Sequence, residues 1–142
     1  MEDINDVILF QIDKTSKVSK LYSQREFDKL DFGITIDQWV LLKIIEESRQ
    51  LSQKELAEKS LRDPASITRT LDILQKKGFI IREALENNRR QYNIILTAEG
   101  ANFVKEHMKV VKQHRAKSTE GFTTEEVEQL KSFLLRIQKN FS

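Results

Sequence analysis

The chain has 142 residues, and its 24 basic side chains almost balance 22 acidic ones, so net charge alone does not indicate nucleic acid. It contains no cysteine, which excludes disulfides, thiolate catalysis and cysteine-bound metals. No segment approaches the ~18 consecutive apolar residues of a membrane span, and residues 1–5 carry acids instead of the basic start of a secretory signal. We therefore expect a single cytoplasmic domain without a membrane partner.

The scarcity of helix-breaking residues predicts a mainly helical chain. Only four Gly and one Pro occur, each at a position where an element should begin or end. A long first helix is expected over residues 3–30, and a second over residues 36–47. Residues 7–10 are apolar on all sides of the first helix, which therefore needs neighbours on more than one side.

Two further helix starts are marked by capping residues. Ser52 and Glu55 have the spacing of a capping box, which predicts a short helix after Ser52. Asp63 followed by Pro64 predicts the start of a fourth helix, because Asp is a favoured N-cap and Pro is tolerated at the first helical position. One face of this fourth helix should be buried, and it consists of Ile67, Leu71 and Leu74.

After the stop expected at Gly78, the apolar spacing changes from helical to alternating. This change predicts a β-hairpin with strands at residues 79–85 and 91–96 and a polar tip over residues 86–89. Residues 62–92 hold seven basic and four acidic side chains, an excess larger than the +2 of the whole chain. A solvated basic face and a nucleic-acid contact both account for this excess.

The last part of the chain should form two more helices. Thr97 is expected to cap a helix over residues 98–117, and Thr123 or Thr124 to cap a last helix that ends near residue 141. The apolar face expected on the first of these consists of Ala101, Val104, Met108 and Val111. The last helix has a heptad-like apolar stripe, and the candidate dimer-interface residues of the two termini are Val7, Ile8, Phe10, Val127, Leu130, Leu134, Ile137 and Phe141. A lone chain would leave much of this surface exposed, which indicates a homodimer.

Three helices followed by a hairpin have the order of a winged helix-turn-helix domain, whose last helix enters a DNA major groove. Small and hydroxyl-bearing residues at the start of that helix permit close approach, and Arg69 has the geometry to bind guanine. The candidate DNA-binding residues are Ser52, Gln53, Lys54, Arg62, Pro64, Ala65, Ser66, Thr68, Arg69, Lys76, Arg89 and Arg90. Docking of a partner protein through the same helix and hairpin remains the alternative.

Residues 36–100 resemble the multiple antibiotic resistance regulator (MarR) family. The matching segments are Asp37 to Leu41, Leu51 to Ala57, Ser66 to Leu71, Leu74 to Ile80, Asn88 to Arg90 and Leu96 to Gly100. The resemblance implies one MarR-like domain over residues 1–142. Its winged helix-turn-helix would span about residues 35–97, and the dimerisation helices about residues 3–31 and 98–142. It further implies a transcriptional repressor that binds a pseudo-palindromic operator in double-stranded DNA.

The resemblance also bears on an effector and on the hairpin, or wing. It implies a small aromatic or phenolic effector between the DNA-binding lobe and the dimer helices, where Trp39 and Tyr22 would line a pocket unless they belong to the core. Arg90 matches the family arginine that enters the minor groove. The family usually has Asp two residues earlier, where this chain has Asn88, so Glu86 becomes the alternative anion.

Nothing else in the sequence indicates a catalytic or metal site. His107 and His114 would lie about 10 Å apart on one helix, too far to share a metal ion. Glycine-rich phosphate loops, nucleophile elbows and the zinc-protease pattern do not occur in the sequence. We therefore expect no enzyme, no cofactor and no metal.

Overall fold

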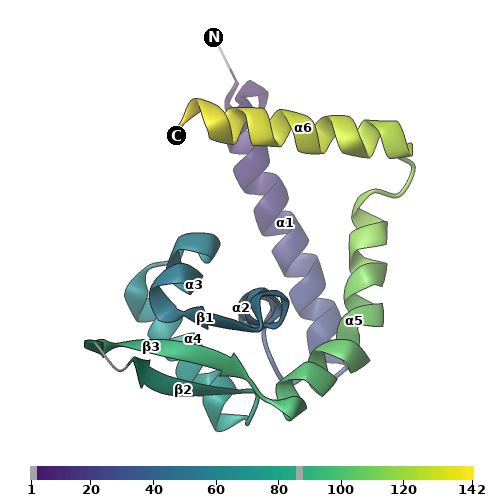
Figure 1. Ribbon diagram of the computed structural model, residues 1–142. Helices are drawn as coiled ribbons and strands as arrows, with labels where there is room; N and C mark the ends of the chain where they lie inside the picture. Colours follow the sequence, from purple (N-terminus) through teal and green to yellow (C-terminus); the bar gives the residue numbers. More distant parts are fainter. Residues whose placement is uncertain (1–2, 86–87) are drawn as a thin grey trace. The chain divides into compact units, whose positions relative to one another are not determined.

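The computed structural model describes residues 3–85 and 88–142, with the side chains of residues 85 and 88–91 outside that description. In chain order (Figure 1), the elements are the 3-10 helix η1 (Ile4–Asp6), α1 (Ile8–Lys29), α2 (Ile36–Ser48), β1 (Gln50–Ser52), α3 (Gln53–Ser60), α4 (Pro64–Lys76), β2 (Ile80–Leu85), β3 (Asn88–Leu96), α5 (Ala98–Ser118) and α6 (Thr124–Asn140). They form two compact units, Met1–Met108 and Lys109–Ser142, which divide within α5. The expected fold class, mainly helical with a small antiparallel sheet, is confirmed.

The helix starts predicted from capping residues are present. Ser52 Oγ accepts a hydrogen bond from the Glu55 amide at 3.0 Å, and the Glu55 carboxylate accepts one from the Ser52 amide at 3.2 Å. Asp63 caps α4 by accepting from the Ser66 amide at 3.0 Å. For α6 the cap is Thr123, not Thr124. These caps satisfy amides that the first helical turn leaves without a partner.

The first helix differs from its prediction at its N-terminus. The sequence predicts one helix from residue 3, whereas Val7 has extended backbone (φ −80°, ψ 120°) that separates η1 from α1. Asp3 accepts a hydrogen bond from the Asn5 amide at 2.9 Å, which closes a short turn. A local bond of this kind competes with continuation of a helix, and apolar spacing gives no sign of it.

The sheet has three strands in the order β1-β3-β2, all antiparallel. Sequence reasoning missed β1, because only Leu51 of its three residues is buried. The strand β3 begins at Asn88, three residues before its predicted start, so residues 88 and 89 belong to the strand. The remaining residues of the predicted tip, Glu86 and Asn87, lie outside the described residues.

The core of the first unit includes a cluster of aromatic rings. Phe32 stacks on Phe27 with ring centroids 3.9 Å apart, and it forms T-shaped contacts with Trp39 and Phe103. The ring of His107 lies 4.1 Å from that of Phe103. This cluster joins α1, α2 and α5, and it places Trp39, only 3% exposed, in the core.

The predicted inward face of α5 needs one correction. Val104 and Val111 are buried and Met108 is half-buried, but Ala101 is exposed. The first turn of α5 packs instead through Gly100, whose Cα lies against the carbonyl group of Phe79. Glycine at this position lets the helix approach the start of β2 more closely than any other residue would.

The turn between α3 and α4 contains a strained leucine. Leu61 has left-handed backbone (φ 54°, ψ 37°), and it is 92% exposed. This conformation costs an L-residue about 1–2 kcal/mol, and the exposed side chain offsets little of that cost by burial. Leu61→Gly should therefore raise the free energy of unfolding by about 0.5–1 kcal/mol after the larger entropy of an unfolded glycine is subtracted.

Urea unfolding at one fixed protein concentration measures the effect of Leu61→Gly. Leu61→Ala is the matched control, because alanine keeps the Cβ that makes this backbone unfavourable and should leave stability almost unchanged. A Leu61→Gly variant less stable than the alanine variant would contradict this account of the turn.

Candidate nucleic-acid interface

The helices α3 and α4, with the turn between them, form the helix-turn-helix. The predicted inward stripe of α4 is fully buried: Ile67, Leu71 and Leu74 have no exposed surface. Thr70 is also buried. The residues exposed on the other side of α4 include Pro64, Ala65, Thr68, Arg69, Asp72 and Lys76, whereas Ser66 is half-buried. The start of α4 therefore presents small side chains and one guanidinium to solvent.

Thr68 is held in place by two hydrogen bonds. Its hydroxyl donates to the carbonyl oxygen of Pro64 at 3.0 Å and accepts from Nε2 of Gln53 at 3.3 Å. The second bond links the first turn of α3 to α4. Gln53 and Thr68 thus form a common surface, although sequence spacing alone gave no reason to pair them.

Three candidate cations are exposed and available to an external anion. Lys54 lies on α3, and Arg69 and Lys76 lie on α4. Within residues 3–85 and 88–142, none of the three forms an ion pair. Ser52 is half-buried, and its oxygen accepts from the Glu55 amide while its hydroxyl proton is still free to be donated.

An arginine outside the predicted set organises the same surface. Arg82 of β2 pairs with Asp72 of α4 at 2.6 Å, and its Nε donates to the side chain of Gln75 at 2.7 Å. The pair neutralises an acid that would otherwise repel phosphate from the exposed face of α4. The periodicity of the sequence carries no signal for this contact, because it joins a helix to a strand across a turn.

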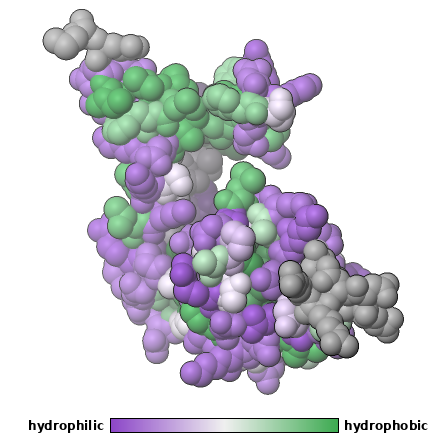
Figure 2. All heavy atoms as spheres, turned by 90° about the vertical axis from the view of Figure 1, so that its left-hand side faces the viewer, coloured by the Kyte–Doolittle hydropathy of each residue, from purple (hydrophilic) through white to green (hydrophobic). Residues whose placement is uncertain are grey.

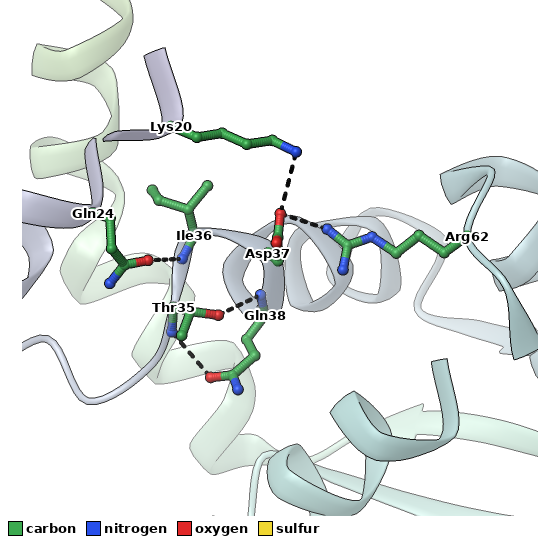
Figure 3. A network of polar contacts seen from close by, with 7 residues as sticks. All are labelled: Lys20, Gln24, Thr35, Ile36, Asp37, Gln38 and Arg62. Atoms are coloured by element: carbon green, nitrogen blue, oxygen red, sulfur yellow. Dashed lines mark hydrogen bonds and ion pairs between the residues drawn. The ribbon is translucent and has the colours of Figure 1, made fainter. Parts of the chain in front are cut away.

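Arg62 differs from Lys54, Arg69 and Lys76, because it already has an anionic partner. Its Nη2 lies 2.7 Å from Oδ1 of Asp37, and only 20% of its side chain is exposed. Lys20 of α1 lies 3.6 Å from the same carboxylate oxygen (Figure 3). The wing residues Arg89 and Arg90 lie in β3, and their side chains fall outside the described part of the chain.

The predicted interface residues of the terminal helices are in part exposed. In α1 and just before it, Ile8 is 64% exposed, and Val7 and Phe10 are half-buried. In α6, Val127, Leu134 and Ile137 are half-buried, whereas Leu130 and Phe141 are 46% and 76% exposed. Figure 2 shows apolar residues exposed among hydrophilic ones on one face of the molecule.

A hollow of about 300 Å³ lies between the end of α1 and the start of α2. Its lining includes Asp28 and Asp31, so it does not suit an anionic aromatic acid. Over the described residues, no helix is both long and apolar enough to cross a membrane. The same residues contain no cluster of three or more His, Asp or Glu side chains that would hold a metal ion.

Three helices, the turn before α4 and a hairpin joined by a third strand define a winged helix-turn-helix domain. Residues 34–92 match the model of the MarR family. The resemblance of this segment to the MarR family is thereby confirmed.

Solved structures of similar fold cover almost the whole chain. A mutant of MarR from E. coli, crystallised with operator DNA, has a TM-score of 0.82 and 25% identity over 96% of this chain and 99% of that chain. The S. aureus MepR–DNA complex has a TM-score of 0.82 and 22% identity over 94% of this chain and 98% of that chain. A SlyA-like transcription regulator from Listeria monocytogenes has a TM-score of 0.82 and 24% identity over 99% of this chain and 90% of that chain. The chain therefore has the fold of MarR-family transcriptional regulators.

Proposed function

We propose that this protein is a sequence-specific DNA-binding transcriptional regulator of the cytoplasm, without catalytic activity. The observation that carries the proposal is the exposed face of α4, where Arg69 is available and Asp72 is neutralised by Arg82. The operator complex of E. coli MarR, at 25% identity over nearly the full chain, supports it.

The proposed contacts divide into two kinds. Arg69 binds a guanine edge in the major groove, with Ser66 and Thr68 beside it, and the small residues Pro64 and Ala65 permit close approach. Contacts to phosphate, which fix the position of the domain without selecting a sequence, come from Ser52, Gln53, Lys54 and Lys76. Arg89 and Arg90 of the wing enter a neighbouring minor groove, where A/T-rich sequence attracts arginine most strongly.

We further propose that the protein acts as a homodimer and as a repressor. Two copies, joined through the apolar residues of α1 and α6, place two recognition helices on the half-sites of a pseudo-palindromic operator. Binding of a small aromatic or phenolic effector releases the DNA. A screen of phenolic acids for release of a labelled operator tests this last step, and loss of binding at saturating ligand is the expected result.

Arg69→Ala tests the recognition helix. If Arg69 binds guanine, the variant should lose about 1–3 kcal/mol of affinity for the operator and become tolerant of substitution at one base pair. Fluorescence anisotropy on the operator and on a set of single-base variants measures both effects. Arg25→Ala is the matched control, because Arg25 is an exposed arginine on α1.

Two results would contradict the assignment of Arg69. An equal loss of affinity on every sequence would make Arg69 a phosphate contact, and unchanged affinity would remove α4 from the groove. If the wild-type protein binds none of the genomic fragments around its own gene at low salt, the alternative holds, and the winged helix docks a partner protein.

A further inference from the structure

Three charged side chains from different elements meet in the first unit at one carboxylate oxygen. Oδ1 of Asp37 lies 2.7 Å from Nη2 of Arg62 and 3.6 Å from Nζ of Lys20. Figure 3 shows Lys20 approaching from α1 and Arg62 from the turn before α4, with Asp37 between them. The oxygen is buried and accepts no hydrogen bond among the described residues, so these two cations are the partners that stabilise it.

The position of Asp37 is fixed by α2 and α1 together. Asp37 lies in the first turn of α2, directly after the capping box of Thr35 and Gln38. The amide of Ile36 donates to Oε1 of Gln24 on α1 at 3.1 Å. A carboxylate in the first turn of a helix is also favoured by the helix dipole. The backbone of Asp37 is therefore held at the junction of α1 and α2.

The position of Arg62 makes this anion relevant to the recognition helix. Arg62 immediately precedes Asp63, which caps α4, and follows Leu61, which has left-handed backbone. A guanidinium held on Asp37 limits where α4 begins, and so limits the direction in which Arg69 and Thr68 approach DNA.

We infer that Arg62 is a positioning residue: through Asp37 it fixes the start of α4 to α2 and α1, and it does not bind phosphate. This inference rests on the proposed DNA-binding function and assigns Arg62 a role different from the direct DNA contact predicted from sequence. Lys20 has a smaller part, since it is farther from the carboxylate and 57% exposed.

The two roles of Arg62 predict opposite effects of Asp37→Asn. If Arg62 binds phosphate, Asp37→Asn frees the guanidinium, and affinity for DNA stays equal or rises. In that case Arg62→Ala also reduces the slope of log affinity against log salt by about one phosphate equivalent. If Arg62 positions α4, both variants lose operator affinity, and neither changes the salt slope.

The test is a double-mutant cycle on the full-length protein with Asp37→Asn, Arg62→Ala and the double variant. Affinity is measured for the operator and for a scrambled duplex over a range of salt concentrations. Each single variant should lower the ratio of operator to scrambled affinity by about tenfold, and the double variant should lose no more than either single one. Asp13→Asn is the matched control, because Asp13 forms an exposed ion pair with Lys17 on α1 and should have no effect.

Several results would overturn the inference. One is an operator affinity that Asp37→Asn leaves unchanged or raises. The others are losses of operator affinity that add in the double variant, and a slope of log affinity against log salt that Arg62→Ala reduces. If an uncharged variant does not fold, Asp37→Glu keeps the charge but displaces it by one methylene; an unchanged affinity ratio then overturns the inference. Absence of DNA binding by the wild-type protein instead overturns the proposed function, and is seen before any variant is compared.

Discussion

Replacing Leu134 by Asp should separate the proposed dimer into monomers and abolish operator binding. Leu134 is half-buried in α6, between the half-buried Val127 and Ile137 and beside the exposed Leu130 and Phe141. In the proposed dimer these side chains are covered by a second copy, so a carboxylate at position 134 would be buried without a cation. Burial of such an unpaired charge costs about 3–5 kcal/mol, which corresponds to a dimer dissociation constant raised by more than about 100-fold.

Sedimentation equilibrium at micromolar concentration measures this dissociation directly. Ser132→Asp is the matched control, because Ser132 is exposed and lies on the opposite side of α6 from Leu134, so its charge should stay in water. The far-ultraviolet circular dichroism of Leu134→Asp separates dissociation from unfolding. A wild-type protein that sediments as a folded monomer, or a Leu134→Asp variant that stays dimeric, would refute the proposed interface.

The features of the fold that sequence predicted well are those with a local physical cause. The capping box of Ser52 and Glu55 and the cap of α4 by Asp63 depend on residues three positions apart. The buried stripe of α4 follows from the helical period, and Leu71, at its centre, has no exposed surface. Hydrogen bonds and burial of this kind depend on residues within one or two helical turns of one another. They can therefore be predicted from a single sequence.

The features that sequence reasoning missed depend on contacts between distant elements. The strand β1 exists because Leu51 pairs with Ile94, more than 40 residues later, and three residues carry too little alternation to reveal a strand. The pair of Arg82 with Asp72 and the pair of Arg62 with Asp37 join elements whose relative orientation is set by the core. In both cases sequence identified a basic surface, but which cations remain available to DNA was decided by tertiary contacts.

Gly100→Ala should destabilise the fold by about 3 kcal/mol, although alanine is normally the better helix former by about 1 kcal/mol. Gly100 is in the first turn of α5, and a Cβ there would clash with the carbonyl oxygen of Phe79 and lie 2.8 Å from Cδ1 of Leu96. The Phe79 carbonyl cannot simply move away, because it accepts the Thr97 amide at 3.0 Å. The Thr97 hydroxyl in turn donates to the carbonyl oxygen of Gly78 at 2.6 Å and accepts from the Gly100 amide at 3.0 Å.

Five residues surround this contact: Gly78, Phe79, Leu96, Thr97 and Gly100. They join the end of α4, both ends of the hairpin and the start of α5, so a shift of any one of them displaces the wing from the recognition helix. Chemical denaturation should therefore show a lower free energy of unfolding for Gly100→Ala, and operator affinity should fall even at temperatures where the variant remains folded. Gly121→Ala is the matched control: it has φ +84° and no atom within 4 Å of an added Cβ. Gly121→Ala should lower the free energy of unfolding only by the cost of left-handed backbone, about 1–2 kcal/mol. It should leave DNA affinity unchanged. A Gly100→Ala variant as stable as the wild type would show that α5 moves away from β2 at no cost, and that the close approach at Gly100 does not fix the wing.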